Sequence, residues 1–258
     1  MSEIDVNEKM YHTNLSKADL EGAHIAIMPG DPFRVPKIAA HMQNSKPLAW
    51  NREYNSYLGE IAGQKVLACS HGIGGPSTAI AVEELHMIGI DTFVRFGTSG
   101  GMALDVCAGD IVVVNAAIRA EGTSKEYLPI EFPAVADLDV TIALREAARE
   151  LTNGHYHVGV AQCKDSYFGQ HDPARMPVSY ELLNKWQAWL RGGAKCSEME
   201  SAAIFTVCST LGCKAGAVML ACWNQEREAA GLPQDKDHDT DLAIRVALLG
   251  IQKLIEAE

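Results

Sequence analysis

The sequence predicts an α/β protein with a central mixed, largely parallel sheet that is flanked by helices. Short runs rich in Val, Ile and Ala alternate with longer stretches of helical character along most of the chain. Near-continuous apolar strands, each followed by a helix, are typical of a parallel sheet that is covered on both faces. The 258 residues contain no internal repeat or linker-like stretch, so we expect a single domain over residues 1–258.

The predicted elements follow this alternation in order. The runs HIAIMP (24–29), KVLACS (65–70), TFVRF (92–96) and DIVVVN (110–115) predict the first four strands, and residues 155–162 and 215–222 predict two more. The longer stretches between and after these strands predict helices over residues 77–87, 138–151, 178–190, 198–211 and 239–256.

Composition excludes several classes of partner. The formal net charge is −11 and no basic tract is present, whereas nucleic-acid binding needs Lys and Arg to neutralise phosphates. No apolar run approaches the roughly 20 residues that span a bilayer, and the acidic, polar N-terminus lacks the pattern of a secretory signal. We therefore expect neither nucleic acid nor membrane as a partner, and we expect a cytoplasmic protein.

Cysteine usage agrees with that expectation. The seven cysteines are scattered, odd in number and never spaced C-x-x-C, which argues against a disulfide framework and against a zinc site. Most have apolar neighbours, and we interpret them as small buried side chains in a reducing compartment.

Three successive strands end in glycine-rich segments. GDPFR (30–34) follows the first strand, HGIGGPS (71–77) follows the second, and GTSGG (97–101) follows the third, with Arg95 just before it. Ligands of α/β sheets bind beyond the carboxyl ends of the strands. Because glycine lets backbone N–H groups approach an oxyanion and arginine donates paired hydrogen bonds to phosphate, we expect an anion site at this edge. The P-loop pattern and G-x-G-x-x-G are both absent, which disfavours a dinucleotide site.

Two further features have both a functional and a structural interpretation. Glu198 and Glu200 stand at a predicted helix start, where they either accept hydrogen bonds from paired sugar hydroxyls or complement the helix dipole, with Ser197 as the cap. Gln170 carries a donor and an acceptor on one planar group, as the O4/N3–H edge of uracil requires; otherwise it is a loop glutamine.

Taken in order, these residues resemble the nucleoside phosphorylase family, most closely its uridine phosphorylase branch. The matching stretches are YH (11–12), LSKADL (15–20), PGDPFRV (29–35), HGIGGPSTAIAVEEL (71–85), VRFGTSG (94–100), PIEFPAVAD (129–137) and SEMESAA (197–203). They cover nearly the whole chain at matching spacing. The resemblance implies a single-domain, three-layer phosphorylase/hydrolase-like fold, inorganic phosphate as co-substrate and no required cofactor.

The resemblance also implies roles for individual residues and a hexamer built from three dimers. Phosphate would be held by Gly30, Arg34, Arg95 and Thr98, with Arg52 supplied by a neighbouring subunit. Ribose would be held by Glu198, Met199 and Glu200, with His12 of the neighbour near the 5′-hydroxyl, and Phe168 or Tyr167 would line the base pocket with Gln170. Arg95, Gln170 and Glu200 would be the catalytic residues, and a monovalent cation would bind at Glu53, Ile73 and Ser77 between subunits.

One segment departs from the family pattern. Where relatives have Q-x-R, with the arginine on a pyrimidine carbonyl, this chain reads Gln170-His171-Asp172 after an apparent one-residue deletion. We expect Asp172 to point away from the base, because a carboxylate would oppose the negative charge of the departing uracil. We expect another cation to replace the arginine: Arg227 is the leading candidate, and Lys164 and Arg175 are the alternatives.

The leaving base is expected to be a pyrimidine. Purine-acting relatives place an aspartate in the last third of the chain to protonate the purine, whereas the matching position here reads Trp223-Asn224-Gln225 and offers no general acid. The expected reaction is uridine plus phosphate to uracil plus ribose 1-phosphate. The alternatives are a purine nucleoside phosphorylase with an atypical base pocket, a non-catalytic nucleoside-binding protein and, more distantly, a dinucleotide-binding oxidoreductase.

Overall fold

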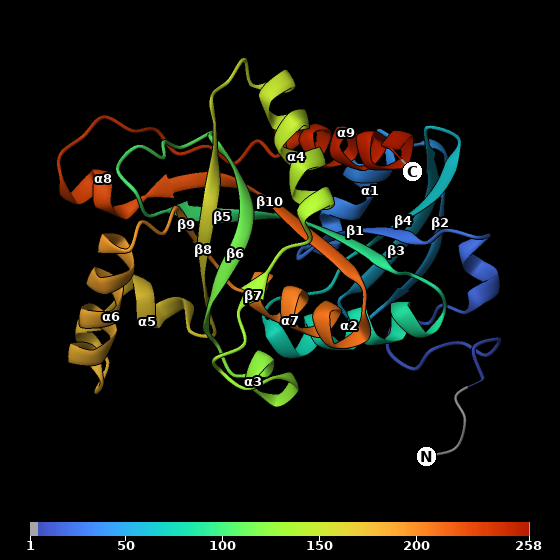
Figure 1. Ribbon diagram of the computed structural model, residues 1–258, viewed down its shortest axis with the longest axis horizontal. Helices are drawn as coiled ribbons and strands as arrows, with labels where there is room; N and C mark the ends of the chain where they lie inside the picture. Colours follow the sequence, from blue (N-terminus) through green and yellow to red (C-terminus); the bar gives the residue numbers. More distant parts are fainter. Residues whose placement is uncertain (1–4, 258) are drawn as a thin grey trace.

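The computed structural model describes residues 5–257, and a ten-stranded mixed sheet runs through its centre (Figure 1). The strands are β1 (Ile25–Pro29), β2 (Gln43–Asn51), β3 (Tyr54–Ile61), β4 (Gln64–Cys69), β5 (Thr92–Gly101), β6 (Ile111–Ala120), β7 (Ala134–Val135), β8 (Tyr156–Lys164), β9 (Cys196–Glu198) and β10 (Lys214–Asn224). They pair in the order β10-β6-β8-β9-β5-β1-β4-β3-β2, with β7 beside β6. Because β10 also pairs with β5, strands β5, β10, β6, β8 and β9 close into a ring.

Helices cover both faces of this sheet, as predicted (Figure 1). The helices are α1 (Val35–Ala39), α2 (Gly75–Met87), α3 (Thr123–Tyr127), α4 (Leu138–Leu151), α5 (Tyr167–His171), α6 (Ser179–Arg191), α7 (Ser201–Leu211), α8 (Gln225–Ala229) and α9 (Asp241–Ala257), with short 3-10 turns at Lys17–Leu20, Pro32–Arg34 and Pro173–Arg175. Helices α2 and α7 pack on one face, and α1, α4 and α9 pack on the other. Helices α5, α6 and α8 lie together at one end of the molecule (Figure 1).

The alternation along β1 shows why the strands are apolar throughout. Ile25 and Ile27 join the hydrophobic cluster under α4 and α9, whereas Ala26 and Met28 join the cluster under α2 and α7. Successive side chains of a strand point to opposite faces, so a strand covered by helices on both sides needs apolar residues at every position.

All six predicted strands are present, and four of them, β5, β6, β8 and β10, continue past their predicted ends. β5 continues to Gly101, so the GTSGG segment is part of a strand rather than a turn. The helix predicted over residues 198–211 begins at Ser201, because residues 196–198 form strand β9. The hairpin of β2 and β3 was not predicted: β2 is an edge strand with a polar sequence that contains Pro47, and edge strands lack the apolar signature of central ones.

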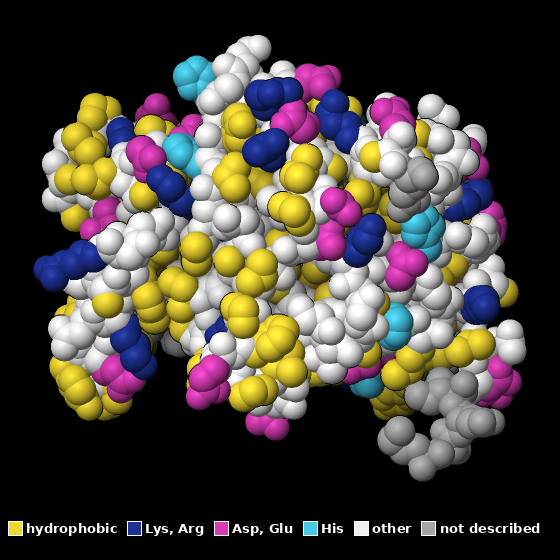
Figure 2. Space-filling view, in the orientation of Figure 1, with side chains coloured by type: hydrophobic (Ala, Val, Ile, Leu, Met, Phe, Trp, Pro, Cys, Tyr) yellow, Lys and Arg dark blue, Asp and Glu magenta, His cyan; other side chains and the backbone are white. Residues whose placement is uncertain are grey.

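The surface carries mixed charges and some exposed apolar side chains. On the face shown in Figure 2, acidic and basic side chains are interspersed, and hydrophobic side chains gather over the region of β7 and α3. That stretch carries the exposed residues Ile130, Phe132 and Val135. Among residues 5–257, no helix combines the length and the apolarity that are needed to cross a bilayer.

Candidate active site

A cavity of about 1060 Å³ opens where the carboxyl ends of several strands converge. This is the location at which α/β sheets bind their ligands. Its walls include Gly30, Asp31, Pro32, Arg34, Glu53, Gly72, Ile73, Arg95, Gly97, Thr98, Ser99 and Gly100 from the glycine-rich segments and nearby chain, and Lys164, Tyr167, His171, Ser197, Met199, Glu200, Cys222, Trp223, Lys236 and His238 from the rest of the chain.

The three glycine-rich segments share one sheet edge, as predicted, because β5, β1 and β4 are parallel neighbours. Gly30 lies so close to the segment after β4 that a Cβ atom here would be 3.1 Å from the carbonyl oxygen of Gly72. Gly72 itself has a φ of +75°, and a Cβ atom there would lie 2.6 Å from the Ser77 hydroxyl. Larger residues at these two positions would strain the backbone or push the segments apart.

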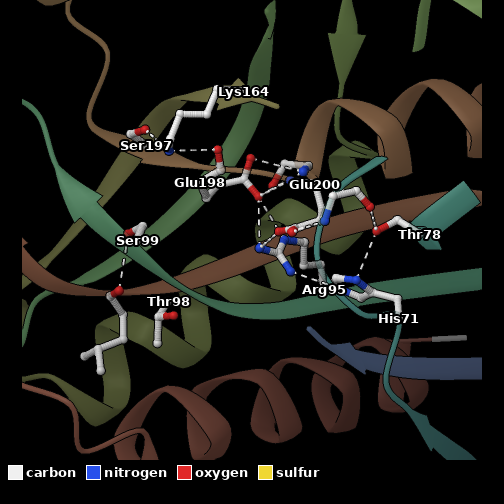
Figure 3. Close-up of polar contacts among 12 residues, drawn as sticks. His71, Thr78, Arg95, Thr98, Ser99, Lys164, Ser197, Glu198 and Glu200 are labelled. Atoms are coloured by element: carbon white, nitrogen blue, oxygen red, sulfur yellow. Dashed lines mark hydrogen bonds and ion pairs between the residues drawn. The ribbon is translucent and has the colours of Figure 1, made fainter. Parts of the chain in front are cut away.

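Arg95 lies at the centre of a buried network of charged and polar side chains (Figure 3). Its Nε donates to Glu198 Oε2 at 3.0 Å, its Nη2 donates to Glu200, and its Nη1 donates to His71 Nε2 at 2.9 Å. The side chains of Arg95 and Glu198 are 3% and 1% exposed. Removing one member of such a network leaves a buried charge without a partner, which is strongly destabilising.

His71 holds the guanidinium of Arg95 as a neutral acceptor. Burial lowers the pKa of His71 well below its ordinary value, and the charge of Arg95 lowers it further. Because Nε2 accepts from Arg95, Nδ1 carries the proton and donates to Thr78 Oγ1 at 3.0 Å, whose hydroxyl donates to the Gly74 carbonyl at 2.9 Å. His71 was not among the predicted site residues, although its place just after a strand end is a signal that could have identified it.

The two glutamates do not share a helix, contrary to prediction. Glu198 ends β9, and its carboxylate accepts the backbone N–H groups of Glu200 and Ser201, both at 2.9 Å. It therefore caps the start of α7, the role that the sequence suggested for Ser197. The Ser197 hydroxyl instead lies 2.6 Å from Gln170 Oε1 and 2.7 Å from the Lys164 ammonium.

Glu200 forms part of the cavity wall. Its carboxylate accepts from Arg95 and from the backbone N–H of Gly74 at 2.7 Å. Burial raises the pKa of Glu200; the charge of Arg95 opposes that shift and Glu198 adds to it. Two carboxylates face one guanidinium in this cluster, so Arg95 alone does not supply a net positive charge for an anion.

Arg34, on the same wall, is a cation with fewer and more distant carboxylate partners than Arg95. Its Nη2 donates to Thr98 Oγ1 at 3.3 Å, and its Nε lies 3.9 Å from the Asp31 carboxylate. Burial lowers the pKa of Arg34, but an arginine stays protonated at neutral pH. The fold thus brings together three of the predicted phosphate ligands: Gly30, Arg34 and Thr98.

A second group of side chains lines the cavity from β8, α5 and β10. Tyr167, His171 and Trp223 form a run of rings, with centroids 4.3 Å apart for the first pair and 6.2 Å apart for the second. Flat rings of this kind are suited to contact a planar base. Gln170 lies next to them and donates from its Nε2 to Gln225 Oε1 at 3.4 Å.

Two of the predicted base contacts are engaged elsewhere. Arg227 donates to the carbonyl oxygens of Leu104 and Pro233 at 2.6 and 2.7 Å, so it braces the chain after α8. Phe168 is 59% exposed and packs against Arg175, and its alternative Tyr167 lines the cavity instead.

Asp172 turns to the surface, as predicted. Its carboxylate pairs with Arg175 Nε at 2.9 Å, and the two side chains are 54% and 57% exposed. The same ion pair engages Arg175. Of the three cations that were expected to replace the missing arginine, Arg227, Lys164 and Arg175, only Lys164 lies on the cavity wall.

His12 and Arg52 lie outside the cavity of their own chain. His12 Nδ1 lies 2.6 Å from Glu84 Oε1, and the Arg52 guanidinium stacks over the ring of Tyr11 at 5.8 Å. Arg52 is exposed on the tight turn between β2 and β3. The next residue, Glu53, is part of the cavity wall, so this turn lies at the cavity rim.

The residues of the predicted cation site lie close to one another. Glu53 Oε1 accepts the Ser77 hydroxyl at 2.7 Å, and Ile73 is 77% exposed beside them. A Cβ atom at Gly72 would come within 2.8 Å of both side chains, so glycine keeps this cradle of oxygen atoms open.

Asn224 has no side-chain atom left for a base. Its Oδ1 accepts from the backbone N–H groups of Glu226 and Arg227, and its Nδ2 donates to the carbonyls of Ala103 and Val106. It therefore caps α8 and anchors that helix to the segment after β5.

The GTSGG segment also spells G-x-S-x-G, the pattern of a hydrolase nucleophile. Its Ser99 hydroxyl donates to the Leu220 carbonyl at 3.2 Å. The segment remains within β5 instead of turning sharply into a helix, so it lacks the geometry that exposes a nucleophilic serine.

The chain is similar to known phosphorylases over nearly its whole length. The phosphorylase superfamily profile matches residues 24–254. Uridine phosphorylase of Treponema pallidum (strain Nichols) is 50% identical over 245 residues, covering 95% of this chain and 94% of the relative. Uridine phosphorylase of Escherichia coli (strain K12) is 40% identical over 254 residues, covering 96% and 98%. Guanosine phosphorylase of Halorubrum lacusprofundi is 35% identical over 253 residues, covering 95% and 99%.

Proposed function

The chain belongs to the phosphorylase superfamily, and we propose that it is a pentosyltransferase that converts uridine and inorganic phosphate to uracil and ribose 1-phosphate. The observation that carries the proposal is a single cavity that joins an edge suited to an anion to a group of aromatic side chains. The edge suited to an anion carries Gly30, Arg34 and Thr98, and Glu200 lines the cavity next to them. The aromatic group carries Tyr167.

In the proposed mechanism, phosphate lies against the Gly30 segment, Arg34 and Thr98, and Met199 and Glu200 hold the ribose. The C1′–N1 bond breaks with its electron pair moving to the uracil ring, and a phosphate oxygen forms the new bond to C1′. The uracil anion then takes a proton from water. Orientation of the two substrates contributes up to about 7–11 kcal/mol, and Arg95 keeps Glu200 in place through its buried ion pair.

We propose that the site is completed by a second copy of the chain, in a hexamer of three dimers. The Arg95 cluster carries no surplus positive charge, so phosphate needs a cation besides Arg34, and Arg52 stands exposed at the rim. Large apolar side chains are exposed around the same rim: Tyr11 at 76%, Phe33 at 69% and Trp50 at 55%. Exposed apolar clusters next to arginine are typical of subunit interfaces.

A monovalent cation at Glu53, Ile73 and Ser77 fits this interface. Carboxylate, hydroxyl and carbonyl oxygens are the ligands that hard cations prefer, and Gly72 leaves the cradle open. We also propose a cytoplasmic location, because all seven cysteines are free and four of them are buried, as is usual in a reducing compartment.

The guanosine phosphorylase relative makes purine phosphorolysis the second candidate. That reaction is favoured by an acid that protonates the leaving purine. Asn224 holds the corresponding position and is fully engaged in hydrogen bonds, which favours the pyrimidine.

A substrate panel tests the proposed function. Uridine, deoxyuridine, thymidine, inosine and guanosine would each be incubated with and without phosphate, and base release would be followed by ultraviolet absorbance. We expect phosphate-dependent release of uracil to be the fastest reaction. Faster release of purines would support the second candidate, and the absence of release would support a nucleoside-binding protein.

A further inference from the structure

His71 is a buried polar side chain to which the proposed mechanism gives no role. It follows β4, it is 0% exposed, and its backbone N–H donates to the Pro29 carbonyl at 3.0 Å. A Cβ atom at Gly30 would lie 3.6 Å from the Cε1 atom of His71, so the imidazole is next to a proposed phosphate ligand. Burying a polar group is costly unless it is hydrogen-bonded, and the partners of His71 therefore indicate what it does.

The hydrogen bonds of His71 close a ring through the site (Figure 3). Arg95 donates from Nη1 to His71 Nε2 at 2.9 Å and from Nη2 to Glu200. Glu200 also accepts the backbone N–H of Gly74 at 2.7 Å. The Gly74 carbonyl accepts the Thr78 hydroxyl at 2.9 Å, and that hydroxyl lies 3.0 Å from His71 Nδ1. The ring thus joins the end of β4, the start of α2, β5 and the glutamate that is proposed to hold the ribose.

Only one protonation state of His71 satisfies every bond of this ring. A carbonyl can only accept, so the single proton of the Thr78 hydroxyl points to Gly74. The hydroxyl must then accept the proton on Nδ1, which leaves Nε2 to accept from the guanidinium, a group that can only donate. A second proton on the imidazole would face the positive charge of Arg95. Burial and the charge of Arg95 both lower the pKa of His71, in agreement with a neutral ring.

The bonds of Arg95 leave one of its N–H groups for a ligand. A guanidinium has five N–H donors. Those on Nε and Nη2 face Glu198 and Glu200, and one on Nη1 is held by His71. Within residues 5–257 the second N–H of Nη1 has no acceptor, and Arg95 is part of the cavity wall. Because the guanidinium is planar, the bond to His71 fixes the direction of this free N–H.

We propose that His71 is a positioning residue for phosphorolysis, which holds Arg95 so that its free N–H meets phosphate while Glu200 stays on the ribose. This inference rests on the proposed function. His71 acts through Arg95 and not by contact with a substrate. Donors that are held in place before the reaction stabilise the transition state without a cost of reorganisation. The ring makes the anion-facing edge and the ribose carboxylate one preorganised unit.

Amide side chains can separate this role from a role in packing alone. The amide of glutamine reaches about as far as Nε2 of histidine, and the amide of asparagine about as far as Nδ1. His71→Gln therefore keeps an acceptor for Arg95, whereas His71→Asn keeps only a partner for Thr78. A residue that merely fills space would not require its acceptor at one particular atom.

The test compares His71→Gln and His71→Asn with the same two substitutions at His155, an exposed histidine that precedes β8. Initial rates with uridine and phosphate would be measured beside circular dichroism, and the affinity for phosphate alone by isothermal titration calorimetry. We expect His71→Asn to lose about 100-fold in kcat/KM for phosphate and about 10-fold in phosphate affinity. His71→Gln should recover most of both losses, and the His155 variants should match the wild type.

A second pair of variants covers the case in which His71→Asn does not fold. Thr78→Val removes the hydroxyl that orients the imidazole, at nearly constant volume, and Thr78→Ser keeps that hydroxyl. We expect Thr78→Val to lose about 10-fold in kcat/KM for phosphate, the size of a lost hydrogen bond, and Thr78→Ser to lose less.

Three results would overturn the inference: equal losses in His71→Gln and His71→Asn, normal turnover and phosphate affinity in His71→Asn, or equal kcat/KM in the two Thr78 variants. A wild-type protein that binds phosphate but releases no uracil would instead contradict the proposed function. The phosphate affinities of the His71 variants would still be measurable in that case, so the two failures are distinguishable.

Discussion

The two ends of the cavity are built in different ways. The end that carries Arg95, His71 and Glu200 is formed by strand ends, and its buried side chains hold one another through short, charged hydrogen bonds. The end that carries Tyr167 and Trp223 is formed by a five-residue helix and by the end of β10, and Tyr167 is 54% exposed. The first end is preorganised by its own network, whereas the second has more freedom to adapt to the base.

Because of this difference, we expect substitutions to be severe at the first end and milder at the second. A side chain with several buried, charged partners cannot be removed without leaving those partners unsatisfied. A half-exposed ring contributes mainly contact area and stacking. Substitutions at the two ends should therefore differ in size and in kind.

The largest effect is expected for Arg95→Ala. The variant leaves Glu198 and Glu200 buried without their cation, which should lower the free energy of unfolding by about 3–5 kcal/mol. It should also reduce the rate of phosphorolysis at least about 100-fold, because the Glu200 carboxylate, which is proposed to hold the ribose, loses the arginine that positions it. Turnover would be measured beside circular dichroism, with Arg149→Ala, an exposed arginine paired with Glu146, as the control. Near-normal kinetics would show that the Arg95 network is structural only.

The next effect concerns the shared site. Arg52→Ala should reduce kcat/KM for phosphate about 10- to 100-fold, the size of a lost charge-assisted hydrogen bond. Co-expression of Arg52→Ala with Arg95→Ala chains should restore part of the activity, because some cavities would then combine an intact Arg95 with an intact partner arginine. Two tagged copies of Arg95→Ala serve as the control. Failure to restore activity, or a fully active monomer by light scattering, would rule out a shared site.

A smaller effect is expected at the aromatic rings. Tyr167→Ala should raise KM for uridine about 10-fold, since stacking of a base on an aromatic side chain contributes about 1–3 kcal/mol. Phe168→Ala, the adjacent and equally exposed ring that packs on Arg175, should change KM by less than about twofold. Initial-rate kinetics at saturating phosphate make the comparison. If the larger effect occurred at Phe168, α5 would have to turn when the nucleoside binds.

The smallest catalytic effect is expected for Arg227→Ala. This side chain joins two backbone carbonyls that lie outside the cavity wall, so kcat/KM for uridine should change by a few-fold at most. The loss of both hydrogen bonds should lower Tm by about 2–4 °C, measured by differential scanning fluorimetry. A large loss of kcat/KM with an unchanged Tm would instead support the expectation that Arg227 contacts the base.

Much of the first end could be predicted before the structure. The glycine-rich segments were expected at one sheet edge because they follow apolar runs that are typical of parallel strands. Gly30, Arg34 and Thr98 do lie together there. The second end was predicted less well, because a short helix such as α5 leaves no clear periodicity, and the sequence did not show which face of it meets the cavity.

Local apolar patterns and short motifs with fixed spacing were enough to predict the layered α/β architecture, the common sheet edge of the glycine-rich segments, and the family. Three features became visible only in the folded chain: Glu198 and Glu200 share one arginine, Glu198 rather than Ser197 caps α7, and Lys164 is the candidate cation that reaches the cavity. The physical reason is that hydrogen-bond partners far apart in sequence are chosen by geometry. Glu200 is 105 residues from Arg95, and Ser197 is 33 from Lys164; only the pairing of β5, β8 and β9 brings them within reach.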